Sequence, residues 1–381
     1  MIEQPHMLLL GSAGRKSGKT ELACRLLRKF SRQHDLVGIK VVTITTGDKK
    51  FHSDGELNTV FPGLKETYHI TEEKNTFSDK DTSRMLNTGA KRVFILCVLK
   101  DYLKQGYAAL MDIIGSNTPS LCESNSLRTV VEPGLFLVLK RSDSSFYKPS
   151  CRAVLGYADR IIISEENRFD INLDQITLID GTWVMQRQAT AIIMAGGKSN
   201  RMGHDKSMLH VNGIPMIEHI IEQIRPCFDE LLISSDDREK FSFLNVHVIP
   251  DSVPGQGPLM GILSCLKTSS NDLNFVIACD VPTINHTFLA RMFRLVDGYD
   301  GVIPRIEDSK YEPLFGIYRK SMIVPIQNII NAGGRKISEV FSTCKINFID
   351  FANAEWYKNL NTLEEYKRLS GTCDHRIGER W

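Results

Sequence analysis

Residues Ala191–Leu209 read AIIMAGGKSNRMGHDKSML, an apolar run followed by two glycines and a basic segment. The apolar run predicts a buried strand, and the paired Gly196 and Gly197 let the backbone turn sharply and approach a ligand without a Cβ atom in the way. Arg201 and Lys206 then add positive charge to the same loop. A strand that ends in a glycine-rich, cationic loop is typical of a nucleotide site, so we expect this loop to hold phosphate groups.

The sequence on either side predicts an α/β fold in which strands alternate with helices on a mostly parallel sheet. This alternation restarts after the loop-like sequence LIDGTWVMQRQ (178–188), so we predict two domains, 1–187 and 188–381. The expected strands lie at 7–12, 36–45, 91–99, 134–140, 159–165, 191–197, 229–237, 246–251 and 273–282, and the expected helices at 20–33, 216–226 and 257–269.

Composition excludes several classes of protein. The 381 residues include 47 Lys plus Arg and 45 Asp plus Glu, a net charge of only +2, so neither nucleic acid nor an anionic membrane is an expected partner. No apolar run reaches the roughly 20 residues that span a bilayer, and we expect a cytoplasmic protein. The nine cysteines are scattered without a C-x-x-C pair, which favours buried thiols over disulfides or a zinc site.

The sequence AGRKSGKT (13–20) follows the first predicted strand and fits a loose P-loop pattern, with Ala13 in place of the usual first glycine. Such a loop wraps a polyphosphate with its backbone N–H groups, while the lysine reaches the terminal phosphates and the threonine can ligate Mg²⁺. Hydrolysis would also need a carboxylate near the metal; Glu123 is the first candidate and Asp81 the second, each with the alternative of being a solvated surface acid. The predicted nucleotide contacts are Gly14, Gly18, Lys19 and Thr20, and Thr20 is also a predicted metal ligand.

The second loop resembles the signature LAGG-x-S-x-RMG-x-DK of the nucleotidyltransferases that make molybdenum-cofactor dinucleotides, and stands here as MAGGKSNRMGHDK (194–206). Four later segments are similar to the family's in the same order, and the matches extend over roughly Ala191 to Leu369. The resemblance implies a Rossmann-like nucleotidyltransferase fold for this half. The four segments are VIPDSVPGQGPLMGI (248–262), IACDVP (277–282), EPLFGIY (312–318) and NLNTLEEY (359–366).

The resemblance also implies roles for individual residues. Arg201 and Lys206 would neutralise a triphosphate, and Asp280, after a buried strand, would hold Mg²⁺ with Asn361 as a second metal ligand. Without the resemblance, Asp280 and Asn361 are ordinary cap or turn residues, and Asp251 is a turn residue. The catalytic set is thus Arg201, Lys206 and Asp280, and the nucleotide contacts are Ala195, Gly196, Gly197, Lys206, Asp251, Gly257, Pro258, Leu259 and Gly261.

The reaction that the resemblance implies is attack by a phosphate oxygen of molybdopterin on the α-phosphorus of a nucleoside triphosphate, with release of pyrophosphate. Positioning and neutralisation by Mg²⁺ and the two cations would carry the catalysis. Gly197 and GPLMG (257–261) resemble guanylyl rather than cytidylyl members, so GTP and molybdopterin are the expected substrates. Molybdenum insertion proteins and apo-molybdoenzymes are the candidate protein partners.

The first half resembles the P-loop GTP-binding adaptor of molybdopterin-guanine dinucleotide synthesis, at SGKT (17–20), VGIKVV (37–42) and DKDTSRMLNTGAKRV (79–93). It departs from that pattern at residues 43–45, where Thr-Ile-Thr replaces the usual histidines, and in the loop filling at 13–16. The whole chain therefore resembles a fusion of adaptor and guanylyltransferase, in which the tether raises the effective concentration of one site near the other.

Other functions remain open from the sequence. The second half is also compatible with transfer to a different acceptor, such as a sugar phosphate, or with the CTP-using branch. A non-catalytic carrier that delivers cofactor to an apo-enzyme is a further alternative. Turnover that disappears in a folded Asp280→Ala variant would distinguish an enzyme from a carrier.

Overall fold

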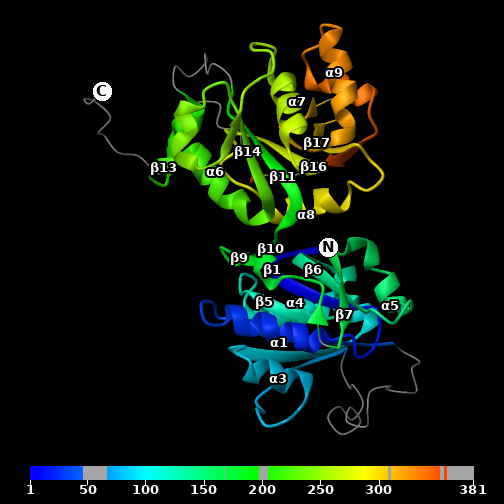
Figure 1. Cartoon of the computed structure of the whole chain (residues 1–381). Coiled ribbons are helices and arrows are strands. Elements are labelled where there is room, and N and C mark those ends of the chain that lie inside the picture. The colour runs from blue at the N-terminus through cyan, green and yellow to red at the C-terminus, as the bar shows by residue number, and fades with distance from the viewer. Residues whose placement is uncertain (46–66, 167, 197–204, 308–309, 352–355, 358–381) are drawn as a thin grey trace. The chain divides into compact units, whose positions relative to one another are not determined.

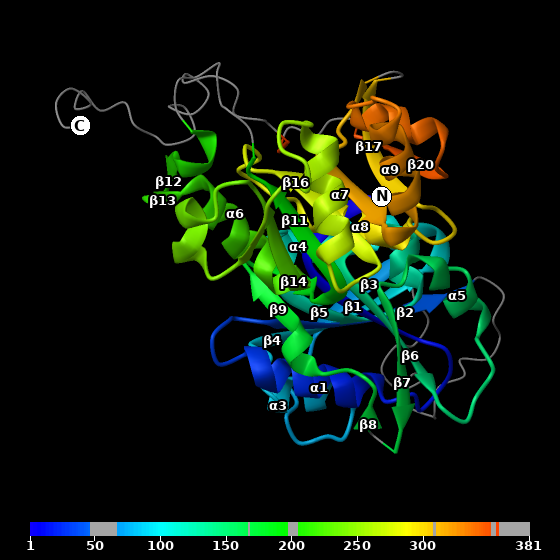
Figure 2. The same cartoon turned by 45° about the horizontal axis from the view of Figure 1, so that its top comes forward.

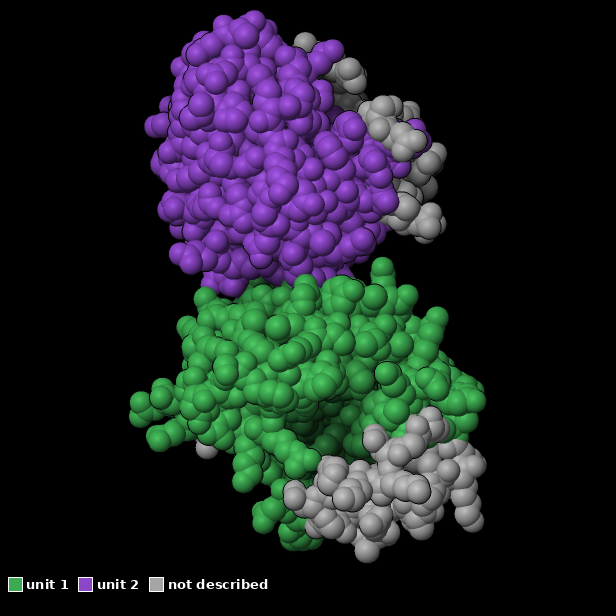
Figure 3. Space-filling view, turned by 90° about the vertical axis from the view of Figure 1, so that its right-hand side faces the viewer, with its two compact units in different colours: residues 1–185 green, residues 186–381 purple. Residues whose placement is uncertain are grey.

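The computed structural model describes residues 1–45, 67–166, 168–196, 205–307, 310–351 and 356–357. The chain divides into two compact units, Met1–Met185 and Gln186–Trp381 (Figure 3). The boundary expected from the sequence, after residue 187, lies two residues further along the chain. None of the helices in these described ranges is long and apolar enough to cross a membrane.

Unit 1 is built on a sheet with the strand order β3-β4-β2-β5-β1-β6-β7-β8, of which Figure 1 labels β1, β5, β6 and β7. Its central strands run parallel, and β3 and β8 pair antiparallel at the two edges. The strands are β1 (Ile2–Ser12), β2 (Val37–Ile44), β3 (Tyr68–Glu72), β4 (Arg92–Leu99), β5 (Ser120–Glu123), β6 (Val131–Arg141), β7 (Arg160–Glu165) and β8 (Arg168–Phe169).

Alternating side chains of β1 give unit 1 a core on each face of the sheet. Leu8 and Leu10 pack with α1, whereas Met7 and Leu9 pack with α4 on the opposite face. The glycine-rich loop between β1 and α1 thus connects a strand whose last residues are buried to a helix that packs on the sheet. The helices of unit 1 are α1 (Lys19–Phe30), α3 (Asp81–Asn87), α4 (Leu103–Ile114) and α5 (Pro149–Arg152).

The segment 178–188 was expected to be a loop, and this expectation is wrong. Strands β9 (Ile176–Ile179) and β10 (Thr182–Met185) form an antiparallel hairpin. They are joined by Asp180 and Gly181, both with positive φ (47° and 78°), which is the geometry of the two-residue turns that hairpins favour. The Asp-Gly pair was a hairpin signal, but the strands beside it are too short to be separated from a linker by pattern alone.

Trp183 fixes this hairpin to unit 1. Its side chain is fully buried, its ring meets Phe30 edge-on at 5.0 Å, and its indole N–H donates to the Ser120 carbonyl oxygen at 3.1 Å. We expect Trp183→Phe to lower the unfolding free energy of unit 1 by about 1–2 kcal/mol, because the ring shrinks and the carbonyl loses its donor. Urea unfolding followed by circular dichroism measures the change. An exposed Tyr102→Phe control should leave the transition in place, and an unshifted Trp183→Phe midpoint would contradict the expectation.

Unit 2 is built on a mixed sheet with the strand order β15-β14-β11-β16-β19-β17-β18, in which β20 also pairs with β17. The first four strands are parallel, as the sequence predicted, whereas β19 is antiparallel to both β16 and β17. The strands are β11 (Arg187–Met194), β14 (Phe228–Ser234), β15 (His247–Ile249), β16 (Leu273–Ala278), β17 (Gly301–Glu307), β18 (Lys310–Tyr311), β19 (Phe315–Arg319) and β20 (Ile346–Asp350).

Helices cover both faces of this sheet. Helices α7 and α9 pack on the face that carries Ile192 and Val276. Helix α8 packs on the opposite face, where Phe293 lies against Phe228. The helices are α6 (Met216–Ile224), α7 (Pro258–Thr268), α8 (His286–Arg294) and α9 (Ile323–Asn331), and a small hairpin of β12 (His210–Val211) and β13 (Ile214–Pro215) precedes α6.

The order of the strands creates a topological switch point in the sheet of unit 2. Strand β11 is the first in this sheet, and it has β14 on one side and β16 on the other (Figure 1, Figure 2). The chain therefore leaves β11 toward one side and returns later on the other. In open α/β sheets, ligands bind beyond the carboxyl ends of the strands at such a switch point.

The cysteines behave as predicted for buried thiols. None of those in the described residues forms a disulfide, and Cys279 and Cys344 are half-buried. Burial raises the pKa of the Cys227 and Cys265 thiols to about 12, so these groups stay protonated and unreactive. The fully buried thiols are Cys24, Cys97, Cys122, Cys151, Cys227 and Cys265.

Candidate functional site

The parallel pairing of β11 with β16 brings two predicted catalytic residues together. Met194 and Ala278 are register partners at the ends of these strands, so the segments after them emerge at the same edge. Lys206 Nζ donates to Asp280 Oδ2 at 2.9 Å, and each side chain is about one fifth exposed (20% and 19%). A cation and a carboxylate at a switch point form a site that can bind both phosphate and metal.

The segment that carries Lys206 is fixed by its neighbours. Asp205 caps the short 3-10 helix η5 (Lys206–Met208), and its Oδ1 accepts from the Ser207 N–H at 3.0 Å and from the Ser207 hydroxyl at 2.6 Å. Its other oxygen forms an ion pair with Lys240. Burial alone would raise the pKa of Asp205, but the contacts with Lys240 and Ser207 hold it below its ordinary value. Asp205 is therefore a structural anion that orients the loop.

The segment that carries Asp280 is also held from outside its own strand. The Gln223 side chain of α6 donates to the Pro282 carbonyl oxygen at 2.9 Å and accepts from the Ile284 N–H at 3.1 Å. The Cys279 N–H donates to the Met194 carbonyl oxygen at 3.2 Å, which continues the ladder past the end of β16. These bonds order the turn that presents the Asp280 carboxylate.

The GPLMG segment forms the start of α7. Gly257 has φ 79° at the N-cap, Pro258 is the first helical residue, and the Leu259 side chain lies fully buried in the core. A Cβ atom on Gly261 would lie 2.5 Å from Ser234 Oγ and 3.3 Å from Asp251 Oδ1. The glycine therefore allows α7 to approach the ends of β11 and β14, and it places Asp251 beside the helix.

The surroundings of Asp251 disfavour the ionised form of its carboxyl group. Its N–H donates to Asp236 Oδ1 at 2.9 Å, and burial, followed by the charge of Asp236, raises its pKa to about 6. The folded chain therefore retains a proton that the unfolded chain releases near pH 4. The resulting stability is complete below the unfolded pKa and is lost as the pH rises through about 6.

We therefore expect Asp251→Asn to raise the melting temperature of unit 2 by a few degrees at pH 7.5 and to change it little at pH 4.5. The asparagine imitates the protonated carboxyl group, so it removes the cost of ionisation that the wild type meets above pH 6. Thermal melts of both proteins at the two pH values test this. A shift of equal size at both values would show that burial and Asp236 do not set the effect.

Glu312 is a site residue to which sequence reasoning gave no individual role. Its carboxylate accepts from the Tyr357 hydroxyl at 3.0 Å. Burial raises its pKa, the Tyr357 bond and Lys310 oppose this rise, and the charge of Asp280 adds to it. Glu312 therefore lies within electrostatic range of Asp280. It stands at the head of the EPLFGIY segment, but the antiparallel return of β19 beside β16 was not evident from the sequence.

The described residues include only part of the predicted set. Ala195, at the end of β11, donates its N–H to the Ser234 carbonyl oxygen at 3.0 Å, and Gly196 follows it. Gly197, Arg201 and Asn361 lie outside the described residues. Lys240 and Gln223 were missed because a single lysine and a helical glutamine carry no pattern that relates them to distant strand ends.

Unit 1 carries the second predicted site, at the loop between β1 and α1. Gly18 has φ 81° and precedes the first residue of α1, Lys19, whose ammonium lies 3.9 Å from Glu123 Oε2. The Glu123 side chain is 2% exposed, and its Oε1 has no hydrogen-bond partner among the described residues. A buried carboxylate with an unsatisfied oxygen is not the solvated surface acid of the alternative interpretation.

The other candidate carboxylate, Asp81, lies on the same side of the sheet. It accepts from Lys40 Nζ at 2.6 Å. Burial would raise its pKa, but the charge and hydrogen bond of Lys40, a hydrogen bond from Thr20 and the charge of Lys19 hold the pKa below its usual value. Both carboxylates proposed from the sequence are thus close to Lys19 or Thr20.

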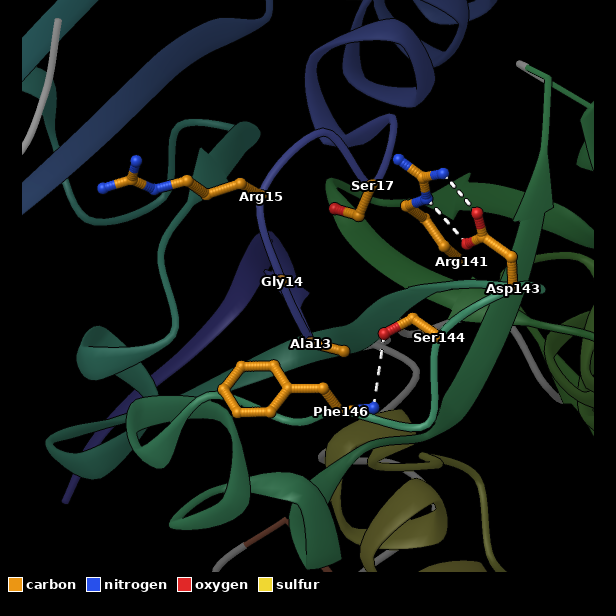
Figure 4. Close-up of a pocket in the computed structure, with 8 residues that line it drawn as sticks. All are labelled: Ala13, Gly14, Arg15, Ser17, Arg141, Asp143, Ser144 and Phe146. Carbon is orange, nitrogen blue, oxygen red and sulfur yellow. Dashed lines mark hydrogen bonds and ion pairs between the residues drawn. The ribbon is translucent and has the colours of Figure 1, made fainter.

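A pocket of about 360 Å³ opens beside this loop (Figure 4). One wall is the loop itself, and the other is the end of β6 with the segment that follows it, where Arg141 and Asp143 form an ion pair. Ser12 at the end of β1 is fastened by Asn125, which accepts from its N–H at 2.7 Å and donates to its carbonyl oxygen at 3.0 Å. The pocket is lined by Ala13, Gly14, Arg15, Ser17, Arg141, Asp143, Ser144 and Phe146.

The sequence of unit 2 is similar to known proteins. Residues 191–344 match the MobA-like NTP transferase domain family. A probable molybdenum cofactor guanylyltransferase of Carboxydothermus hydrogenoformans is 34% identical over 187 residues, which cover 47% of this chain and 94% of the relative. The corresponding protein of Pelotomaculum thermopropionicum is 33% identical over 202 residues, 51% of this chain and 98% of the relative.

Among solved structures, the molybdopterin-guanine dinucleotide biosynthesis protein A of Archaeoglobus fulgidus is similar, with 22% identity and a TM-score of 0.42, over 48% of this chain and 98% of that chain. The two relatives above carry the assignment, because this chain covers almost all of each at more than 30% identity. The chain thus belongs to the molybdenum cofactor guanylyltransferases, a family of nucleotidyltransferases, and residues 191–344 are its MobA-like NTP transferase domain.

Proposed function

We propose that unit 2 transfers GMP from GTP to molybdopterin and releases pyrophosphate. The observation that carries this proposal is the contact between Lys206 and Asp280 at the switch point of the sheet. The relatives that match this chain are named as guanylyltransferases of the molybdenum cofactor, which supports GTP as the nucleotide.

The chemistry requires little from the protein beyond placement and charge. An oxygen of the pterin phosphate forms a bond to the α-phosphorus of GTP, and the bond from that phosphorus to the β-phosphate bridging oxygen breaks. The phosphate nucleophile is already ionised near neutral pH, so no strong general base is needed. Lys206, with Arg201 from the same loop, would stabilise the negative charge that develops on the phosphates.

Mg²⁺ fits the residues on this edge. Magnesium prefers oxygen ligands and is commonly held by one or two carboxylates together with substrate phosphates. Asp280 supplies a carboxylate, with Glu312 within electrostatic range, and Asn361 is the further ligand proposed from the sequence. Among the described residues, no three His, Cys, Asp or Glu side chains form a metal cluster, so the nucleotide would complete the coordination. The ion would neutralise phosphate charge.

For unit 1 we propose nucleotide binding in an adaptor role. Gly18, Lys19 and Thr20 at the start of α1 would hold the phosphates, and Thr20 would ligate Mg²⁺. The buried Glu123, with its unpartnered oxygen, supports a ligand at this position. Covalent attachment to unit 2 would keep the adaptor at high effective concentration near the transferase.

Pyrophosphate release from the purified chain tests the proposal. GTP, CTP, ATP and UTP are offered separately with Mg²⁺ and molybdopterin, and GTP alone should support release. Release with CTP would assign the chain to the cytidylyl branch. A parallel assay replaces molybdopterin with a sugar phosphate, and GTP-dependent release only in that assay would assign a different acceptor. No release with any nucleotide would favour a carrier.

A further inference from the structure

The segment that follows β6 is hydrogen-bonded to the phosphate-type loop of unit 1. Strand β6 pairs in parallel with β1, and Ser12 and Leu139 are register partners, so both strands end at the same edge. The chain then reaches Lys148, whose N–H donates to the Ala13 carbonyl oxygen at 2.8 Å. Lys148 is therefore held against the first residue of the loop by its own backbone.

The side chain of Lys148 extends toward the same loop. Its Nζ lies 3.4 Å from Ser12 Oγ, and the side chain is half-buried. Lys19 occupies the other end of the loop, at the start of α1. Two lysines that come from different strand-to-helix connections thus lie at the two ends of one phosphate-type loop.

The charges around Lys148 favour an anion at this end of the loop. Burial lowers the pKa of Lys148, and the charges of Lys19 and Arg15 lower it further, so both of these cations lie within electrostatic range of Lys148. Among the described residues, Lys148 has no carboxylate in an ion pair, and Glu123 pairs with Lys19. Keeping the charge of Lys148 beside that of Lys19 while partly removing it from water is costly, and a bound anion would offset this cost.

We propose that Lys148 is a second phosphate-binding lysine of unit 1, which contacts the terminal phosphate of a nucleoside triphosphate held by the P-loop. The inference rests on the proposed nucleotide binding by this unit. The P-loop lysine reaches the β- and γ-phosphates, and Lys148 is near enough to Lys19 for the two charges to interact. The pocket beside Ala13 and Gly14 leaves space at this end of the loop (Figure 4). Lys148 would therefore favour a triphosphate over a diphosphate.

The experiment compares GTP and GDP affinity by isothermal titration calorimetry. It uses the full chain with Asp280→Ala and Lys206→Met as the parent, because these two changes should weaken nucleotide binding by unit 2 and leave unit 1 unaltered. Adding Lys148→Met should weaken GTP binding by about 10–100-fold, the loss expected for one charge-assisted hydrogen bond, and GDP binding by less than about threefold. Lys148→Arg should restore most of the preference for GTP, because it retains the charge.

Lys140→Met is the matched control. This lysine lies on β6, and its ammonium sits 5.1 Å from the centre of the Tyr147 ring, so its removal should leave both affinities unchanged. Equal losses for GTP and GDP, or none, with Lys148→Met would overturn the inference alone. Failure of the parent chain to bind either nucleotide would overturn the proposed adaptor function together with it.

Discussion

Asp280→Ala should lower the rate of GTP-dependent pyrophosphate release by about 10³-fold, the upper end of the range for removing one group that stabilises transition-state charge. Two effects combine. The substitution deletes the carboxylate proposed to hold Mg²⁺ at the end of β16, and it leaves Lys206 without the partner that it contacts at 2.9 Å. Steady-state assays at saturating GTP and Mg²⁺ measure the change.

Asp280→Ala should lower kcat while leaving the melting temperature of unit 2 nearly unchanged. Asp280 lies in a turn that is held independently by Gln223, so the fold should survive its removal. Asp297→Ala is the matched control, because the Asp297 side chain is 97% exposed. If Asp280→Ala melts like the wild type and still turns over at a tenth of its rate or better, Asp280 is not the central metal ligand.

The strands and the helix that flank the two glycine-rich loops were predicted from the sequence. The strand before each glycine-rich loop, the helix after the first and the strand before Asp280 were all expected, because each is a long apolar or periodic run between clear turn residues. The strand β5 was not expected, since its four residues, Ser120–Glu123, are too short to show a period. Glu123 was nevertheless proposed as a candidate carboxylate, on its chemistry alone.

The parts that were missed depend on neighbours in space. The parallel pairing of β11 with β16 joins Lys206 to a residue 74 positions later, and only the strand order reveals it. Glu312 approaches Asp280 because β19 runs antiparallel beside β16. Lys148 reaches the loop that follows β1 because β6 pairs with β1. In each case a local pattern shows that a polar residue follows a strand, but not which other strand lies beside it.

The same pairing explains why the sites lie at strand ends. Side chains along a buried parallel strand face the cores, where a charged group would be expensive. Only the residues just after the last ladder bond, such as Asp280 and Gly196, leave the core while their positions are still set by the sheet. The strand ends thus offer rigid placement and access to water together, which a phosphate-transfer site requires.

Lys206→Met should reduce kcat/KM for GTP by about 10²–10³-fold. The variant removes a positive charge that would neutralise the phosphates, while its unbranched side chain retains most of the packing of the lysine stem. It also leaves Asp280 without the contact to the Lys206 ammonium. If that contact positions the carboxylate, more Mg²⁺ should be needed for the half-maximal rate.

Lys267→Met is the control, since Lys267 donates to Gln327 at the exposed end of α7. Lys206→Arg keeps the charge on a longer, planar group and should recover only part of the rate, because one ammonium cannot be replaced by a guanidinium without moving the contact with Asp280. A Lys206→Met enzyme within threefold of the wild type would show that the cations outside the described residues carry the phosphate charge, and the catalytic role would then pass to Arg201.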